Sequence, residues 1–124
     1  MLIEFFVLLI VFQLKHFLAD YIFQGKYMLG KFKEKGWVAP LFTHVCVHGV
    51  ITLIIALFFV NTFLTALFIA FLDMIIHFIM DRIKASPKLL GRYTIKQKQF
   101  WWSLGFDQMI HHLTHYFIIF ILLV

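Results

Sequence analysis

The sequence predicts an all-α fold, a bundle of four transmembrane helices, and three observations lead to that fold class. With 63% hydrophobic residues, 14% charged residues and a mean hydropathy of +0.94, the chain is too apolar for a soluble domain. Its 124 residues hold four spans of ~20 residues each and little else. Inside these spans, ionisable residues recur four positions apart, which places them on one face of a helix.

The chain is expected to be a single integral membrane domain, residues 1–124, with spans at residues 2–24, 40–60, 62–84 and 100–124. The first stretch lacks a positive n-region and a small-residue cleavage site, so we expect a retained span rather than a signal peptide. Pro40 suits the first turn of the second helix. The very short turn at Asn61 and Thr62 makes the second and third spans an antiparallel hairpin. Ser86-Pro87 follows the third span, and the fourth starts near Phe100.

The basic residues predict the orientation of the bundle. Ten of the eleven Lys and Arg residues fall between Lys26 and Lys98, in or beside the connections that follow spans one and three. The positive-inside rule then places both connections in the cytoplasm and both termini outside. Anionic lipid headgroups account for the net charge of +5, so we expect membrane lipids and no nucleic acid as partners. The basic segment 26–35 is expected to be solvated at the headgroup level.

Four polar series, one in each span, are the most informative feature of the chain. Ionisable groups within a membrane are costly and usually mark a working site. At ~1.5 Å of rise per residue, the antiparallel spans bring these groups to one level in the cytoplasmic half of the bundle. We therefore expect a single interior cluster made of these series: His16 and Asp20; His44 and His48; Asp73, His77 and Asp81; Asp107, His111 and His115.

Three other polar residues are expected outside that cluster. His112 lies about 100° around its helix from His111, and Cys46 lies about 200° from His44, so both should face elsewhere. Cys46 is expected to be an inert thiol. Glu4 differs from His16 in both depth and direction and should reach the external headgroups.

The charge of the cluster predicts a bound cation. One ionised aspartate at the centre of a span costs roughly 2.5 to 3.5 kcal/mol, and four of them would cost on the order of 10 kcal/mol. Protonated histidines, Lys15, Lys84, water or bound cations could offset that cost, and two divalent metals would balance four carboxylates. Mixed imidazole and carboxylate ligands suit zinc best here, with iron or manganese as alternatives.

The motifs also resemble those of a known family. The pattern that carries the resemblance consists of His16-x-x-x-Asp20 with Gln24, His44, His77-x-x-x-Asp81-x-x-Lys84 and Asp107-Gln108-x-x-His111. Over almost the whole chain, this pattern is similar to that of a domain-of-unknown-function family of small bacterial and phage integral membrane proteins. The resemblance implies a multi-pass protein of the bacterial cytoplasmic (inner) membrane and a site, but no activity. A looser similarity is to membrane-bound metal-dependent hydrolases. His48, Asp73 and His115 fall outside the family pattern, so their assignment rests on spacing and depth.

The leading interpretation is a metal-dependent membrane hydrolase that acts on an amphiphilic or lipid-like substrate at the cytoplasmic face. His16 or His48 would complete the metal shell or act as a base, and Gln24, Gln108 and Lys84 would orient an anionic or ester substrate. Asp73 and His115 are weaker ligand candidates. The primary ligands are expected to be Asp20, His44, His77, Asp81, Asp107 and His111.

Three alternatives stay open at this point. His44-x-x-x-His48 and His111-His112-x-x-His115 resemble the histidine boxes of di-iron membrane desaturases and hydroxylases. An Asp–His relay for protons or cations is a second alternative, although the external halves of the spans carry few polar residues and a thin bundle would need a homo-oligomer. The third is a non-catalytic accessory membrane subunit.

Overall fold

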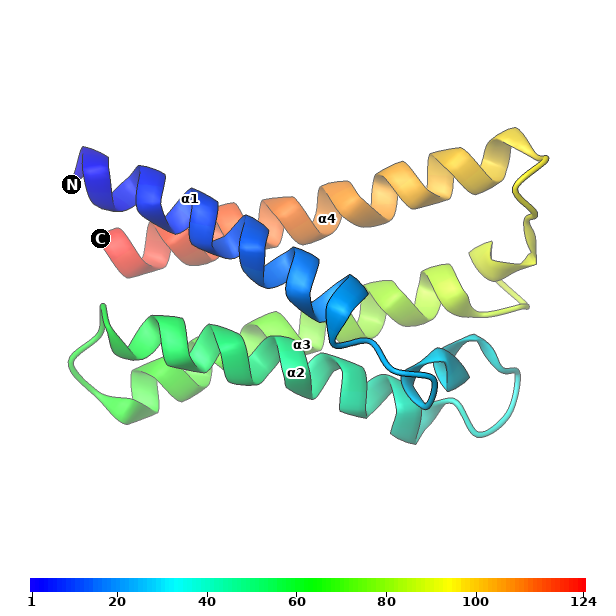
Figure 1. Cartoon of the computed structure of the whole chain (residues 1–124), viewed down its shortest axis with the longest axis horizontal. Coiled ribbons are helices and arrows are strands. Elements are labelled where there is room, and N and C mark those ends of the chain that lie inside the picture. The colour runs from blue at the N-terminus through cyan, green and yellow to red at the C-terminus, as the bar shows by residue number, and fades with distance from the viewer.

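Four apolar stretches of the chain form α-helices that lie side by side along one axis, and the chain contains no strand (Figure 1). A computed structural model describes residues 1–124, and it confirms the predicted all-α fold. A π-helical turn, η1, continues the first helix, and two short 3-10 segments, η2 and η3, lie in the connections. In chain order the elements are α1 (Leu2–Phe17), η1 (Leu18–Ile22), η2 (Met28–Phe32), α2 (Val38–Leu57), α3 (Phe63–Ala85), η3 (Leu90–Arg92) and α4 (Lys98–Leu123).

The helices begin and end within three residues of the expected spans, for local reasons. α2 begins at Val38, so Pro40 lies in the first turn, where the N–H it lacks would have had no helical partner. α3 begins after Thr62, whose hydroxyl accepts a hydrogen bond from the Thr65 N–H at 3.2 Å. α4 begins at Lys98, and the helical turns of the first span end at Ile22 rather than at residue 24.

Three of the four helices are long and apolar enough to cross a membrane: Leu2–Ile22, Val38–Leu57 and Phe63–Arg92. α4 has 26 residues, which is ample length, but its polar residues lower its hydropathy. Those residues include Asp107, Gln108, His111, His112 and His115. The crossing expected for residues 100–124 therefore stays a prediction.

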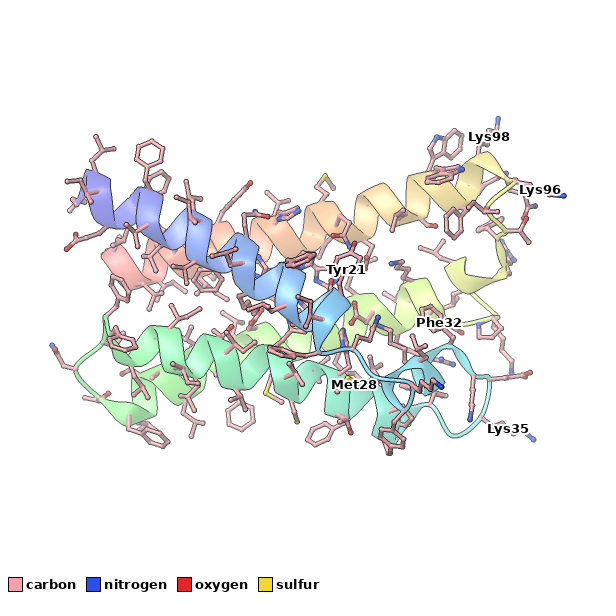
Figure 2. The ribbon with its side chains drawn as sticks, viewed as in Figure 1. Tyr21, Met28, Phe32, Lys35, Lys96 and Lys98 are labelled. Atoms are coloured by element: carbon pink, nitrogen blue, oxygen red, sulfur yellow. The ribbon has the colours of Figure 1, made fainter.

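The bundle has two chemically different ends. Both termini and the α2–α3 turn lie at one end, while η2, η3 and the starts of α2 and α4 lie at the other (Figure 1). The exposed lysines Lys35, Lys96 and Lys98 belong to this second end (Figure 2). The expected α2–α3 hairpin with its short turn is present, since only residues 58–62 separate the two helices.

An apolar core fills the end that holds the termini. Two of its members, Ala56 and Ala66, are fully buried, and such small residues allow neighbouring helices in a membrane bundle to approach closely. Polar side chains are therefore confined to the other half of the interior. The nine buried residues of this core are Leu8, Phe12, Ile55, Ala56, Ala66, Ile69, Ile118, Ile119 and Leu122.

This arrangement predicts that the two ends of the bundle are accessible from opposite sides of a membrane. Single cysteines at Asn61 and Lys96, introduced as Asn61→Cys and Lys96→Cys in a Cys46→Ser background, should react with a membrane-impermeant maleimide from different faces. One should be labelled in intact cells and the other only after permeabilisation. Equal labelling of both from the same face would contradict the transmembrane arrangement.

Candidate metal centre

The π-helical turn at the end of the first span places Asp20. The Phe23 N–H donates to the Leu18 carbonyl at 2.7 Å, five residues back, and single turns of this kind are frequent at functional sites. The Gln24 side-chain amide donates to the Asp20 carbonyl at 3.0 Å and so satisfies the end of the turn. Gln24 thereby holds the backbone that carries the Asp20 carboxylate.

The first group of converging side chains joins η1 to α2. Asp20 Oδ1 lies 2.7 Å from His48 Nε2 and 3.4 Å from His44 Nε2. The two histidines lie one turn apart on α2, both are fully buried, and their ring centroids are 5.0 Å apart. One oxygen of Asp20 and one nitrogen from each of His44 and His48 lie within 4.8 Å of one another, and we call these three residues the first triad.

The second group joins α3 to α4. His111 Nε2 lies 2.9 Å from Asp81 Oδ1 and 3.1 Å from Asp107 Oδ1, and all three residues are buried. Their ligand atoms also lie within 4.8 Å of one another, and we call these three residues the second triad. His44 Nε2 of the first triad is 3.1 Å from Asp81 Oδ2 of the second. Side chains from η1, α2, α3 and α4 thus form one continuous site.

His77 lies between the two triads. Its ring centroid is 4.1 Å from that of His48 and 4.1 Å from that of His111. His77 Nδ1 lies 3.0 Å from the Asp73 Oδ1 atom and 3.1 Å from the Asp73 carbonyl oxygen. Both neighbours are acceptors, so the proton belongs on Nδ1 and the lone pair on Nε2, which is buried without a hydrogen-bond partner. His77 also forms a third group with His16 and His115, in which one ring nitrogen from each residue lies within 4.8 Å of the others.

A buried ion pair lies beside His77, toward the apolar core. Lys15 Nζ donates to Asp73 Oδ2 at 2.5 Å, and the Thr52 hydroxyl donates to the same oxygen at 2.5 Å. Lys15 Nζ is also 3.3 Å from His115 Nε2. All of these side chains are buried, and Asp73 belongs to none of the three converging groups. Its Oδ2 atom is occupied by Lys15 and Thr52, while its Oδ1 atom faces His77 Nδ1 without a hydrogen bond.

Two members of this ion-pair cluster were not among the predicted site residues. Lys15 figured only as a charge that could offset the aspartates, although it continues a buried stripe that includes Leu8, Phe12 and Ala19. Thr52 extends the four-residue step of His44 and His48 by one more turn. Thr52 could have been found from helical spacing, since it lies on the face of α2 already assigned to the interior, whereas Lys15 lies about 100° around α1 from His16 and could not.

The expected substrate-orienting residues lie at the more open edge of the site. Lys84 Nζ lies 3.1 Å from Asp107 Oδ2, and the Lys84 side chain is 27% exposed. The Gln108 amide nitrogen donates to the same Asp107 oxygen at 3.0 Å, and its Oε1 lies 2.7 Å from His16 Nε2. His16 Nε2 is also 3.2 Å from Asp20 Oδ2. Asp20, with an 18% exposed side chain, is the most open of the four aspartates in the site.

One lysine of the basic segment is not solvated, contrary to expectation. Lys31, on η2, is 8% exposed, and its Nζ lies 3.9 Å from Asp81 Oδ2. Burial lowers the pKa of Lys31 below its ordinary value, and the Asp81 carboxylate acts in the opposite direction. Neighbours such as Lys33 and Lys35 are exposed as expected.

The residues expected outside the cluster lie away from the triads. His112 is only partly buried, belongs to no converging group, and has its Nδ1 3.1 Å from Gln13 Nε2. Its ring does touch the edge of the site, 5.3 Å from that of His16. Cys46 lines an apolar pocket between α2 and α3, and Glu4 is exposed and pairs with the N-terminal amine at 3.1 Å.

Several ring nitrogens of the site have no hydrogen-bond partner in the protein. The Nε2 atoms of His16, His48 and His111 face carboxylate oxygens, while their Nδ1 atoms are buried and unpaired. Carboxylates and imidazoles gathered in this way form a ligand set for a divalent transition metal. Each triad offers three ligand atoms, which is the number of protein ligands at metal sites where a further position is left for water or substrate.

Comparison with protein families shows that the family model described as a protein of unknown function (DUF3307) matches residues 7–124. No curated protein and no solved structure matches the chain.

The Lys15–Asp73 pair predicts a specific pattern of stability changes. Lys15→Met should lower the free energy of unfolding by about 3–5 kcal/mol, because it leaves the Asp73 carboxylate buried without its counter-charge. Lys15→Met/Asp73→Asn should recover much of that loss, since neither charge then remains. Unfolding by a denaturing detergent, titrated into protein in mild micelles, measures both. A double variant no more stable than Lys15→Met would contradict the pairing.

Proposed function

Since the chain belongs to the DUF3307 family, whose description gives no function, we propose a function from the site itself. The protein binds two divalent metal ions, most suitably zinc, and hydrolyses an amphiphilic, lipid-like substrate at the cytoplasmic face of the bacterial inner membrane. The observation that carries this proposal is the pair of triads, each with three ligand atoms within 4.8 Å, joined through His44 and Asp81.

The contact between His44 and Asp81 supports a shared cation. His44 Nε2 and Asp81 Oδ2 lie 3.1 Å apart, yet neither atom makes a hydrogen bond. Each is buried, and an unpaired buried polar atom of this kind is costly. Two facing ligand atoms without a hydrogen bond suit coordination to one cation, and coordination would remove that cost.

The side chains around the triads suit hydrolysis. Divalent ions would supply Lewis-acid activation of a water molecule. His16 lies between Asp20 and Gln108 at the edge of the site, where it is placed to accept a proton from that water. Asp73 fixes the tautomer of His77 and so presents its unpaired Nε2 to the site.

The placement of the termini supports four crossings with the basic loops inside. Both termini lie at one end of the bundle, so an even number of helices must cross if any do (Figure 1). α1, α2 and α3 have the length and hydropathy to cross, so α4 is the fourth crossing. The positive-inside rule then assigns the end with Lys35, Lys96 and Lys98 to the cytoplasm, and the triads lie in the half of the bundle nearer to it.

A di-iron redox enzyme is the second candidate, because iron accepts the same imidazole and carboxylate ligands. Metal analysis and a Mössbauer spectrum would identify it. The arrangement favours transport less, since an apolar core fills the bundle between the site and the end that holds the termini. If the protein is instead a non-catalytic accessory subunit, the purified protein should contain no bound metal.

The proposal predicts about two metal ions per chain, held by the triads. Purified wild-type protein should contain zinc, iron or manganese in that ratio by mass spectrometry. Asp20→Asn and Asp81→Asn should each lose metal, because each removes a charged ligand from one triad. His112→Ala is the matched control and should keep it. The proposal would be wrong if wild-type protein contained no stoichiometric metal and chelators did not change its fold.

A separate prediction concerns Asp73, which was expected as a weak ligand and whose carboxylate pairs with Lys15 and Thr52 and faces His77. In Lys15→Met/Asp73→Asn, no buried charge is left alone, but His77 loses a carboxylate partner. Zinc affinity, measured by competition with a chromophoric chelator, should fall about 10- to 100-fold while the number of ions bound at saturation is unchanged. If the double variant loses an ion outright, Asp73 is itself a ligand.

A further inference from the structure

The charge of the loaded site points to the substrate. The Asp73 carboxylate is already neutralised by Lys15, so it cannot balance a metal ion. Three carboxylates are left, those of Asp20, Asp81 and Asp107. With neutral histidines they would face four positive charges from two divalent ions and two more from Lys31 and Lys84. The site would then carry an excess of three positive charges, which is costly in a buried position unless an anion is bound.

We propose that the group hydrolysed is a phosphate monoester, and that Lys31 and Lys84 bind its phosphoryl oxygens beside the second triad. This inference rests on the proposed function, because it takes the two metal ions as given. A dianionic phosphoryl group removes most of the excess charge, whereas an uncharged carboxyl ester removes none. Paired metal ions also suit displacement at phosphorus.

Lys31 is held at the site by contacts between Arg82 and the segment that contains η2. The Arg82 guanidinium donates to the Lys31 carbonyl at 3.0 Å and to the Lys33 carbonyl at 3.2 Å. It also lies over the Trp37 ring at 3.9 Å. Because Arg82 follows Asp81 directly on α3, these contacts fix η2 beside the second triad.

A glycine allows this docking of η2. A Cβ atom at position 30 would lie 2.7 Å from Pro40 Cγ on α2, so Gly30 permits an approach that a larger residue would block. The Lys31 ammonium is therefore placed by the fold and buried. Its ionic partner Asp81 is 3.9 Å away, at the limit of pairing. That ammonium is available to a closer anion.

Lys84 reaches the same triad from a different element. It lies three residues after Asp81 on α3, its Nζ is 3.1 Å from Asp107 Oδ2, and its side chain is 27% exposed. Lys31 and Lys84 thus flank Asp81 and Asp107, one buried and one open to the surroundings. Ammonium groups bind phosphate as point charges.

The reaction balances with water as the only co-reactant. The water oxygen forms a bond to phosphorus while the P–O bond to the alcohol breaks. One water proton goes to the leaving alcohol, and the other stays on the phosphate. The products are the free alcohol and hydrogen phosphate, and no oxidant or reductant is needed.

Binding of inorganic phosphate tests the two lysines without relying on activity. Zinc-loaded full-length protein in uncharged detergent micelles should bind phosphate in a calorimetric titration. Lys31→Gln and Lys84→Gln should each weaken that affinity by about 10- to 100-fold, because each removes a charge-assisted contact. Zinc content should be unchanged in both, since neither lysine is a ligand.

Matched variants separate the assignment from general charge effects and from misfolding. Lys35→Gln changes an exposed lysine of the same segment and should leave phosphate affinity within about twofold (Figure 2). Lys31→Arg keeps the charge and should retain most of the binding. If Lys35→Gln weakened phosphate affinity as much as Lys31→Gln does, the assignment would be wrong. It would also be wrong if phosphate affinity were unchanged in both Lys31→Gln and Lys84→Gln.

Substrate pairs distinguish the class of ester and its source. p-Nitrophenyl phosphate should be hydrolysed and p-nitrophenyl butyrate should not. Phosphatidic acid in mixed micelles and glycerol 3-phosphate in solution separate a lipid source from a soluble one, and turnover of either supports the class. Metal-loaded protein that cleaves only the carboxyl ester would overturn this inference and leave the proposed function standing. Protein that binds no metal would overturn both.

Discussion

The ion pair between Lys15 and Asp73 is the contact that organises the polar interior. An ammonium and a carboxylate this deeply buried are each costly alone, so they fix each other in place. The same carboxylate also holds Thr52 of α2 and His77 of α3, and the lysine comes from α1 and reaches His115 of α4. One charge pair therefore ties four helices together at the boundary between the apolar core and the candidate metal centre. The other oxygen of this carboxylate faces His77 Nδ1 at 3.0 Å, and the His77 ring stacks on that of His111.

Composition, chain length and helical spacing together were sufficient to predict the all-α fold and most of the residues that meet in the interior. Residues four positions apart share a face, and antiparallel helices bring equal depths together, so His44, His48, Asp81, Asp107 and His111 could be grouped from the sequence. Each of them is in a triad. Their roles as metal ligands belong to the proposed function.

Helical spacing could not predict which of the buried aspartates pairs with a lysine and which remain available in the triads. Asp73 was already a weaker ligand candidate in the sequence, but only the packed structure shows that Lys15 pairs with it and leaves three carboxylates. Lys15 was expected only as one of several charges that could offset the aspartates, and its burial depends on a stripe shared with Leu8 and Phe12. Lys31 was missed for a different reason. A basic segment is ordinarily solvated, and its docking depends on Arg82, Trp37 and the absence of a side chain at Gly30.

The π-helical turn at Leu18–Ile22 makes the site depend on residue count as well as residue type. Deleting any one residue of that turn other than Asp20 would leave every candidate ligand in the chain. It would also move the positions that follow by about 100° around the helix axis relative to His16. Asp20 and Gln24 would then no longer both reach their present partners on α2 and the backbone. In comparing members of the family, an unbroken interval from His16 to Gln24 is therefore as informative as the identity of the ligands themselves.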